Sequence, residues 1–93
     1  MIIEKSKAKN KRFVAIFKDG KKVNFGLKNP KVGTYIDHKD KTIRKNYRAR
    51  HVVNEKKFYS NPRTPATLSR FILWGEATNL KDAIKDYERK FKI

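Results

Sequence analysis

The chain has 93 residues, of which 25 are Lys or Arg and nine are Asp or Glu, so its formal net charge at pH 7 is +16. A chain of this length builds one compact core, and its 12% of aromatic residues argues against a disordered basic tail. The absence of cysteine excludes disulfides and thiolate metal sites, and no apolar run is long enough to span a bilayer.

The chain begins with "MIIEKSKAKNKR", a polar and lysine-rich stretch whose apolar patch is too short for a secretory signal. We expect residues 1–12 to form a mobile basic arm, and residues 13–93 to form the compact domain. Next, "RFVAIFKDGKKVNFGLK" places two β-prone runs around Asp-Gly, which predicts a β-hairpin. A two-residue loop would pair Ile16 with Val23, whereas a three-residue loop would put Phe13 on the face of Phe25. We favour the two-residue loop.

Residues 28–33 read as a turn, and "GTYID" as a short third strand. A helix is expected from Lys41 to Glu55, with Asp40 or Asp37 as its N-cap. At about 100° per residue, Ile43, Tyr47 and Arg50 fall on one side. Arg50 on that apolar side would need an acidic partner. The opposite side carries a basic stripe of Lys41, Arg44, Lys45 and Arg48.

Two further helices are expected in the last third of the chain. In "TPATLSRFILWG", Thr64 is a good N-cap, Pro65 suits the first helical position and Gly75 is a good stop. Core packing is the expected role of its large apolar residues, Trp74 included. The final helix, capped by Asn79 or Thr78, places Leu80, Ile84, Tyr87 and Phe91 on one stripe. The fold class is therefore α+β: an N-terminal β-hairpin or small three-stranded antiparallel sheet, followed by three helices packed on it.

The charge pattern predicts a non-enzymatic nucleic-acid-binding protein with low sequence specificity, because Lys and Arg on one face can hold phosphates. Duplex DNA is favoured over RNA as the partner, and no cofactor is expected. The basic stripe would carry the contacts, helped by the arm and the hairpin. The candidate contact residues are Lys41, Arg44, Lys45, Arg48, Lys5, Lys7, Lys9, Lys11, Arg12, Lys21 and Lys22.

Two alternatives remain. A structural or interaction protein could use the same charge to bind an acidic protein or a membrane surface. A metal-dependent nuclease of the ββα-metal type would use His38, Asn46 and His51, but the spacing between His38 and Asn46 is too short for that motif. Tyr47, Phe58 and Tyr59 are the aromatic residues best placed to stack on bases, with core packing as the ordinary role of each.

Several runs in order along the chain are "DGKKVNFG", "TYIDHKD", "NYRARH", "TPATLSRFILWG" and "LKDAIKDYERKF". Together they resemble a family of small, basic, uncharacterised proteins encoded by nucleocytoplasmic large DNA viruses of algae and amoebae. The resemblance covers about residues 12–92, and it departs from many members in having Phe58 and Tyr59 where those carry a tryptophan. It implies a viral protein that acts in a virus factory, a host nucleus or a virion, with viral DNA and other virion proteins as partners. It implies no catalytic residues.

Overall fold

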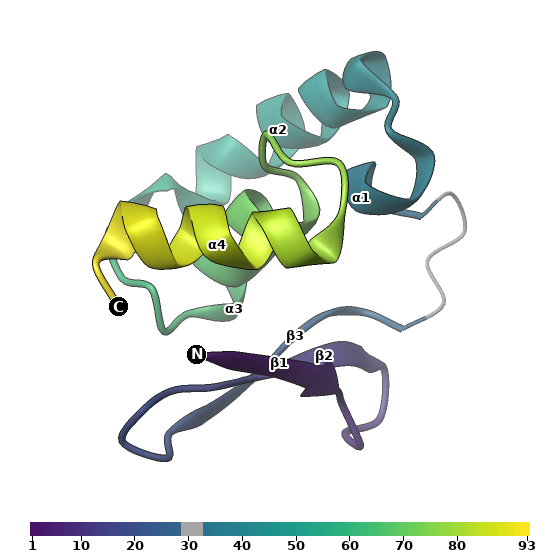
Figure 1. The fold of residues 1–93 in the computed structure, drawn as a ribbon. Coiled ribbons are helices and arrows are strands. Elements are labelled where there is room, and N and C mark those ends of the chain that lie inside the picture. The colour runs from purple at the N-terminus through teal and green to yellow at the C-terminus, as the bar shows by residue number, and fades with distance from the viewer. Residues whose placement is uncertain (29–32) are drawn as a thin grey trace.

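A computed structural model describes residues 1–28 and 33–93, and in it helices lie over one face of a small sheet (Figure 1). The sheet has three antiparallel strands in the order β1-β2-β3. Their bounds are Ile2–Lys5 for β1, Lys11–Ile16 for β2 and Lys22–Leu27 for β3. The α+β class is thereby confirmed, with the sheet entirely N-terminal to the helices.

Residues 1–12 form β1, the turn after it and the start of β2, so the prediction that they form an arm outside the compact domain was wrong. Strand β1 pairs with β2 from Ile2 opposite Ile16 to Lys5 opposite Phe13. Ile3 packs against the core, and the N-terminal ammonium pairs with Glu88 of the last helix at 3.1 Å. Burial of Ile3 and this ion pair explain why a short lysine-rich segment is held in place.

The hairpin has the three-residue loop, so our preference for two residues was wrong. The Phe17 amide donates to the Lys21 carbonyl at 2.9 Å, and the Gly20 amide donates to the Phe17 carbonyl at 2.9 Å. Gly20 has φ +87°, as the last residue of such a loop requires. Phe13 consequently pairs with Phe25, and Ala15 with Val23. A one-residue change of register would turn this apolar set away from the helices.

Residues 35–38 form a short helix, α1 (Tyr35–His38), and not the expected third strand. Thr34 and Asp37 make a capping box, in which the Asp37 carboxylate accepts from both the amide and the hydroxyl of Thr34 at 2.8 Å. The Thr-x-x-Asp spacing is a recognised helix-start signal, and it outweighs the β-prone Tyr-Ile pair. The turn expected over residues 28–33 lies mostly outside the described residues.

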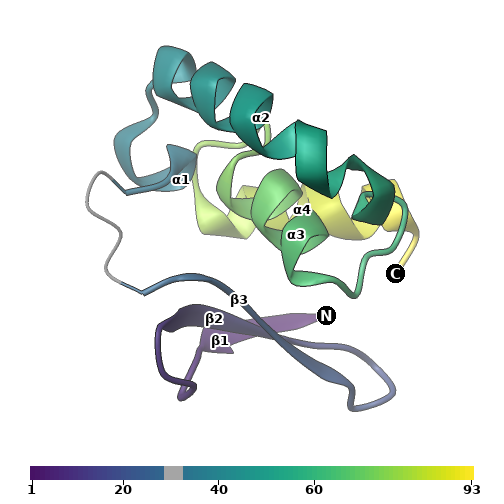
Figure 2. The same ribbon diagram turned by 180° about the vertical axis from the view of Figure 1, so that it is seen from behind.

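The remaining helices follow the sequence prediction closely (Figure 2). Asp40, Thr64 and Asn79 are N-caps whose side chains accept from main-chain amides of the first turn. The helix that starts at Pro65 changes to π-helical geometry before Gly75. The bounds are α2 Lys41–Glu55, η1 Lys56–Phe58 (a 3-10 turn), α3 Pro65–Leu68, η2 Ser69–Leu73 (the π-helical turn) and α4 Leu80–Phe91.

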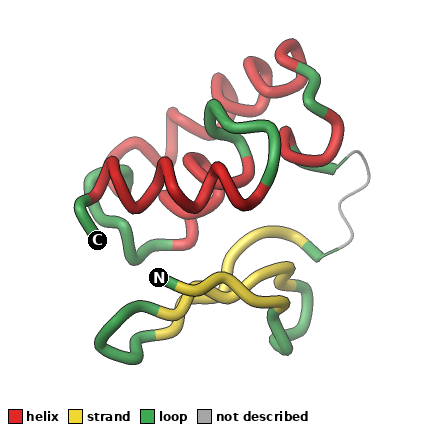
Figure 3. The backbone as a smooth tube through the Cα atoms, in the orientation of Figure 1, coloured by secondary structure: helices red, strands yellow, loops and turns green. Residues whose placement is uncertain are grey.

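Figure 3 shows the strands and the helices as separate layers, and the core residues come from the sheet and from α3, η2 and α4, which face each other. Phe25, Leu68, Ile72 and Tyr87 are almost completely buried. Trp74 is 6% exposed, so the expectation that it packs in the core is confirmed. Helix α2 differs from α1, α3 and α4 because none of its residues is fully buried.

Candidate nucleic-acid interface

Ion pairs within the described residues are made by arginine, by His51 and by the amino terminus, and none by lysine. Of the nine Asp and Glu side chains, all but that of Glu4 accept a hydrogen bond within the described part of the chain. The acidic groups are therefore already occupied. The arginine pairs are Arg12–Asp37, Arg44–Glu76, Arg48–Glu76, Arg63–Asp19 and Arg89–Asp86.

Arg44 and Arg48 face the body of the protein, whereas the sequence had placed them on the solvent side of α2. The Arg44 guanidinium donates to the Gly75 carbonyl at 3.0 Å, and Arg48 Nε donates to the Trp74 carbonyl at 3.0 Å. Both also reach the Glu76 carboxylate. Unpaired carbonyls at the end of a helix attract cations, which explains the inward orientation. The basic stripe is thus divided, and its exposed members are Lys41 and Lys45.

The electrostatics around Glu76 are dominated by arginine. The hydrogen bond from Arg48 lowers the pKa of Glu76, and the charges of Arg44 and Arg70 act in the same direction. Arg70 is half-buried beside them, and burial lowers its pKa. One carboxylate thus neutralises only part of the charge of three neighbouring arginines, and this corner of the molecule stays positive.

Arg12 is likewise engaged inside the protein. Its guanidinium makes a bidentate pair with Asp37 of α1, with N···O distances of 2.8 and 2.7 Å, and a hydrogen bond to Thr34 at 3.2 Å. This pair holds the pKa of Asp37 well below its usual value of 3.8. Arg12 therefore joins the sheet to α1, and its guanidinium is less available to a phosphate than the neighbouring lysines are.

A group of exposed lysines lies at one end of the sheet, and we call these residues the sheet-tip lysines: Lys5, Lys7, Lys9, Lys11 and Lys28. Lys5, Lys11 and Lys28 line a hollow of about 520 Å³ together with Arg12 and Asp37. Lys7 and Lys9 are in the β1–β2 connection beside it. The β1–β2 turn, α1 and the N-terminal end of α2 lie on the same side of the molecule in both views (Figures 1 and 2).

The hairpin lysines Lys21 and Lys22 do not extend this group. Lys22 pairs with Ile16 at one end of β2, and Lys11 pairs with Leu27 at the other. Both hairpin lysines are exposed, but they lie across the length of the sheet from the sheet-tip lysines. The predicted contact residues thus form separate groups on the surface.

The aromatic residues next to α2 are stacked on one another. Tyr47 lies between Trp74 and His51, with ring centroids 4.0 and 3.9 Å away. Burial, with the nearby Glu55 carboxylate, raises the pKa of Tyr47 to about 12. Both ring faces are covered, so Tyr47 is not open for base stacking. Tyr59 packs edge-on against Phe71, whereas Phe58 is 41% exposed.

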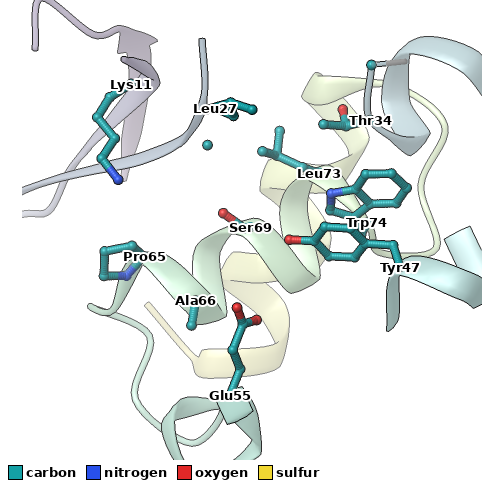
Figure 4. Close-up of a pocket in the computed structure, with 12 residues that line it drawn as sticks. Lys11, Leu27, Thr34, Tyr47, Glu55, Pro65, Ala66, Ser69, Leu73 and Trp74 are labelled. Carbon is teal, nitrogen blue, oxygen red and sulfur yellow. The ribbon is translucent and has the colours of Figure 1, made fainter. Parts of the chain in front are cut away.

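A pocket of about 320 Å³ opens beside this stack, between the sheet and the helices (Figure 4). Figure 4 shows the Tyr47 and Trp74 rings together at one wall, with Lys11 entering from the sheet and Glu55 from α2. Ser69 and Thr34 contribute hydroxyl groups to the lining. The pocket therefore has an aromatic wall and a few polar groups around it.

The residues considered for a nuclease site have separate environments. His38 Nδ1 accepts from the Asp40 amide at 2.9 Å, and its ring packs on Trp74. His51 Nδ1 contacts Glu55 at 2.9 Å. Asn46 is on the exposed side of α2. Within residues 1–28 and 33–93, no three His, Asp or Glu side chains are grouped as metal ligands would be.

Among the helices of the same described residues, none is both long and apolar enough to cross a membrane.

Sequence reasoning identified the cationic residue types but not the internal roles of Arg12, Arg44 and Arg48. The acidic partner of Arg44 and Arg48 is Glu76, which the helix periodicity does not indicate; the available signal is its position directly after Gly75, the expected end of a helix. No curated protein and no solved structure matches the chain. A family model described as "Family of unknown function (DUF5754)" matches residues 1–51, which span the sheet, α1 and most of α2. The chain belongs to this family of unknown function.

Proposed function

We propose that this protein is a non-enzymatic nucleic-acid-binding protein that holds the phosphate backbone of DNA mainly through lysine. The observation that carries the proposal is the division of roles between the two cationic residue types. Five of the seven arginines pair with acidic side chains of the protein itself, while the described lysines make no ion pair. Most of the +16 charge is therefore available to an external polyanion.

The sheet-tip lysines are the proposed main phosphate contact. Lys5, Lys11 and Lys28 converge on one hollow, and Lys7 and Lys9 lie beside it in the β1–β2 connection. Lysine ammonium groups act as mobile point charges, which suits phosphates in any sequence. Lys41 and Lys45 of α2 add a second contact on the exposed side of that helix.

The proposed setting is a large DNA virus, because the runs from "DGKKVNFG" to "LKDAIKDYERKF" resemble small basic proteins of such viruses. In a virus factory, a host nucleus or a virion, a compact cationic domain would neutralise and organise viral DNA. A viral origin is not required for the binding chemistry, which depends on charge alone.

Fluorescence anisotropy with a labelled duplex of about 20 base pairs in a salt series tests the proposal. We expect log K to fall linearly with log salt, with a slope of about −0.9 for each phosphate neutralised. Binding that is flat between low and physiological salt would contradict it. A tight homodimer by light scattering, together with flat salt dependence, would favour an interaction protein with an acidic partner.

A further inference from the structure

The exposed side of α2 has a regular composition that the phosphate contacts do not explain. At about 100° per residue, Thr42, Asn46, Ala49 and Val53 follow one another along the helix and form what we call the outer line. All of these residues are exposed, and Val53 is 81% exposed. Their side chains are short, so another molecule can approach the helix backbone closely along this line.

Cations border the outer line on both sides. Lys41 and Lys45 lie toward one edge, Arg50 lies toward the other, and all are exposed. The sequence placed Arg50 on the packed side with an acidic partner, but within the described residues Arg50 is in no ion pair. No acidic residue is found on the exposed face of the described helix. The face thus has a neutral centre and positive edges.

The opposite side of α2 is fixed to the protein, which keeps the exposed face accessible. Arg44 and Arg48 bind carbonyls near the end of η2, and Tyr47 stacks on Trp74. Figures 1 and 2 show α2 along the outside of the helical layer, away from the sheet. The helix is held rigidly by one side only, and the outer line is on the other.

We propose that the outer line of α2 enters the major groove of duplex DNA and reads bases there, a step that rests on the proposed function. The major groove of B-DNA is about 12 Å wide and admits an α-helix. The positive edges of the helix would then lie beside the two phosphate walls of the groove. The short neutral centre would face the base edges.

The residue types assign specific contacts within the groove. Asn46 has the amide that pairs with adenine through N6 and N7. The methyl groups of Ala49 and Val53 match the thymine methyl. The protein would therefore favour A·T pairs at the positions under α2. This goes beyond the low specificity expected from the sequence, because the sheet-tip lysines supply affinity in any sequence while α2 adds a preference.

The test is a binding selection from duplexes with about ten randomised base pairs, using the full chain, followed by anisotropy on the enriched duplex and on a scrambled one. Wild-type protein is expected to prefer the enriched duplex about 10-fold or more. Asn46→Ala should lower that preference by about 10-fold while its binding to the scrambled duplex stays the same. The matched control is Asn54→Ala, an exposed asparagine on the same helix but off the outer line, which should retain the preference. Far-UV circular dichroism establishes that both variants are folded.

The possible results separate this inference from the proposed function. Salt-dependent binding without any enriched sequence overturns the groove-reading role of α2 and leaves the phosphate-binding proposal in place. Equal affinity for duplex RNA of the enriched sequence also overturns it, because the major groove of A-form RNA is too narrow and deep for a helix. If Asn46→Ala and Asn54→Ala abolish the sequence preference equally, the groove-reading role of α2 is also overturned. Failure to bind any duplex overturns both proposals.

Discussion

Tyr47 lies flat on Trp74, with ring centroids 4.0 Å apart and ring planes 6° apart. Through this contact a helix with no fully buried residue is attached to the hydrophobic core. The hydrogen bonds of Arg44 and Arg48 to the carbonyls of Gly75 and Trp74 fix the same helix from beside the stack. The orientation of α2 is therefore fixed by the Tyr47 ring and the two arginines, together with Ile43, which also packs against the core.

Removal of the Tyr47 ring should weaken the whole domain. We expect Tyr47→Ala to lower the free energy of unfolding by about 2–3 kcal/mol, somewhat below the range for fully buried aromatic residues because Tyr47 is half-buried. Tyr47→Phe keeps the ring and should change stability by less than about 0.5 kcal/mol. Urea unfolding followed by fluorescence measures both, since Trp74 is the one tryptophan of the chain. Equal stability of Tyr47→Ala and wild type would refute the role of the stack.

Replacing Arg48 with lysine should destabilise the protein, although the charge is kept. Arg48 donates from Nε to the Trp74 carbonyl and from the guanidinium end to Glu76, and a lysine ammonium cannot reach both in that geometry. Arg48→Lys should therefore lower the free energy of unfolding by about 1 kcal/mol. The control is Lys45→Arg on the exposed side of α2, which should stay within about 0.5 kcal/mol of wild type. Full stability of Arg48→Lys in the same urea experiment would contradict this account.

Because of the ion pair between Asp37 and Arg12, the free energy of unfolding should depend on pH in the acidic range. Because the hydrogen bonds from Arg12 lower the pKa of Asp37 in the folded state, its contribution is fully present above the usual value of 3.8 and is lost as the pH falls below that value. Asp37→Asn should be less stable than wild type at pH 7 and should lose less stability between about pH 5 and 2. Urea midpoints at several pH values measure this. Glu4→Gln serves as the control, and it should follow the wild-type pH dependence because the Glu4 carboxylate accepts no hydrogen bond in the described chain.

Two glycines should respond differently to alanine. A Cβ at Gly75 would clash with the Phe71 carbonyl oxygen, so Gly75→Ala must displace the end of η2 and should cost more than about 2 kcal/mol. A Cβ at Gly20 meets no atom within 4 Å, and its cost comes from φ +87° alone, about 1 kcal/mol. Thermal unfolding of the two variants measures the difference. A smaller loss of stability at Gly75 than at Gly20 would contradict the packing described for η2.

The local signals in the sequence predicted most helices correctly. Asp40, Thr64 and Asn79 cap helices because their side-chain oxygens satisfy main-chain amides within the next few residues, so no distant information is needed. The capping box of Thr34 and Asp37 is also a local signal, and it outweighs the β-propensity of Tyr35 and Ile36.

Features that depend on distant partners could not be predicted in the same way. Strand β1 forms because β2 offers an open edge and Glu88, far along the chain, pairs with the amino terminus. Helix periodicity predicted the wrong packed side for Arg44 and Arg48, because these residues donate to main-chain carbonyls that follow η2. A periodicity analysis treats arginine as a solvent residue, whereas here it has an internal structural role.

In the proposed function, the sheet-tip lysines bind nucleic acid while the paired arginines stabilise the fold. The most direct test compares Lys9→Glu/Lys11→Glu/Lys28→Glu with Lys81→Glu/Lys85→Glu/Lys92→Glu, whose exposed lysines are in or beside α4 and whose change in net charge is the same. In anisotropy with one duplex across a salt series, the sheet-tip variant should bind at least about 10-fold more weakly than the α4 variant. Its salt slope should be smaller by about 0.9 for each phosphate that the variant no longer neutralises. Equal affinity and equal slope in the two variants would show that binding follows total charge alone, and would contradict a phosphate-binding site at the sheet tip.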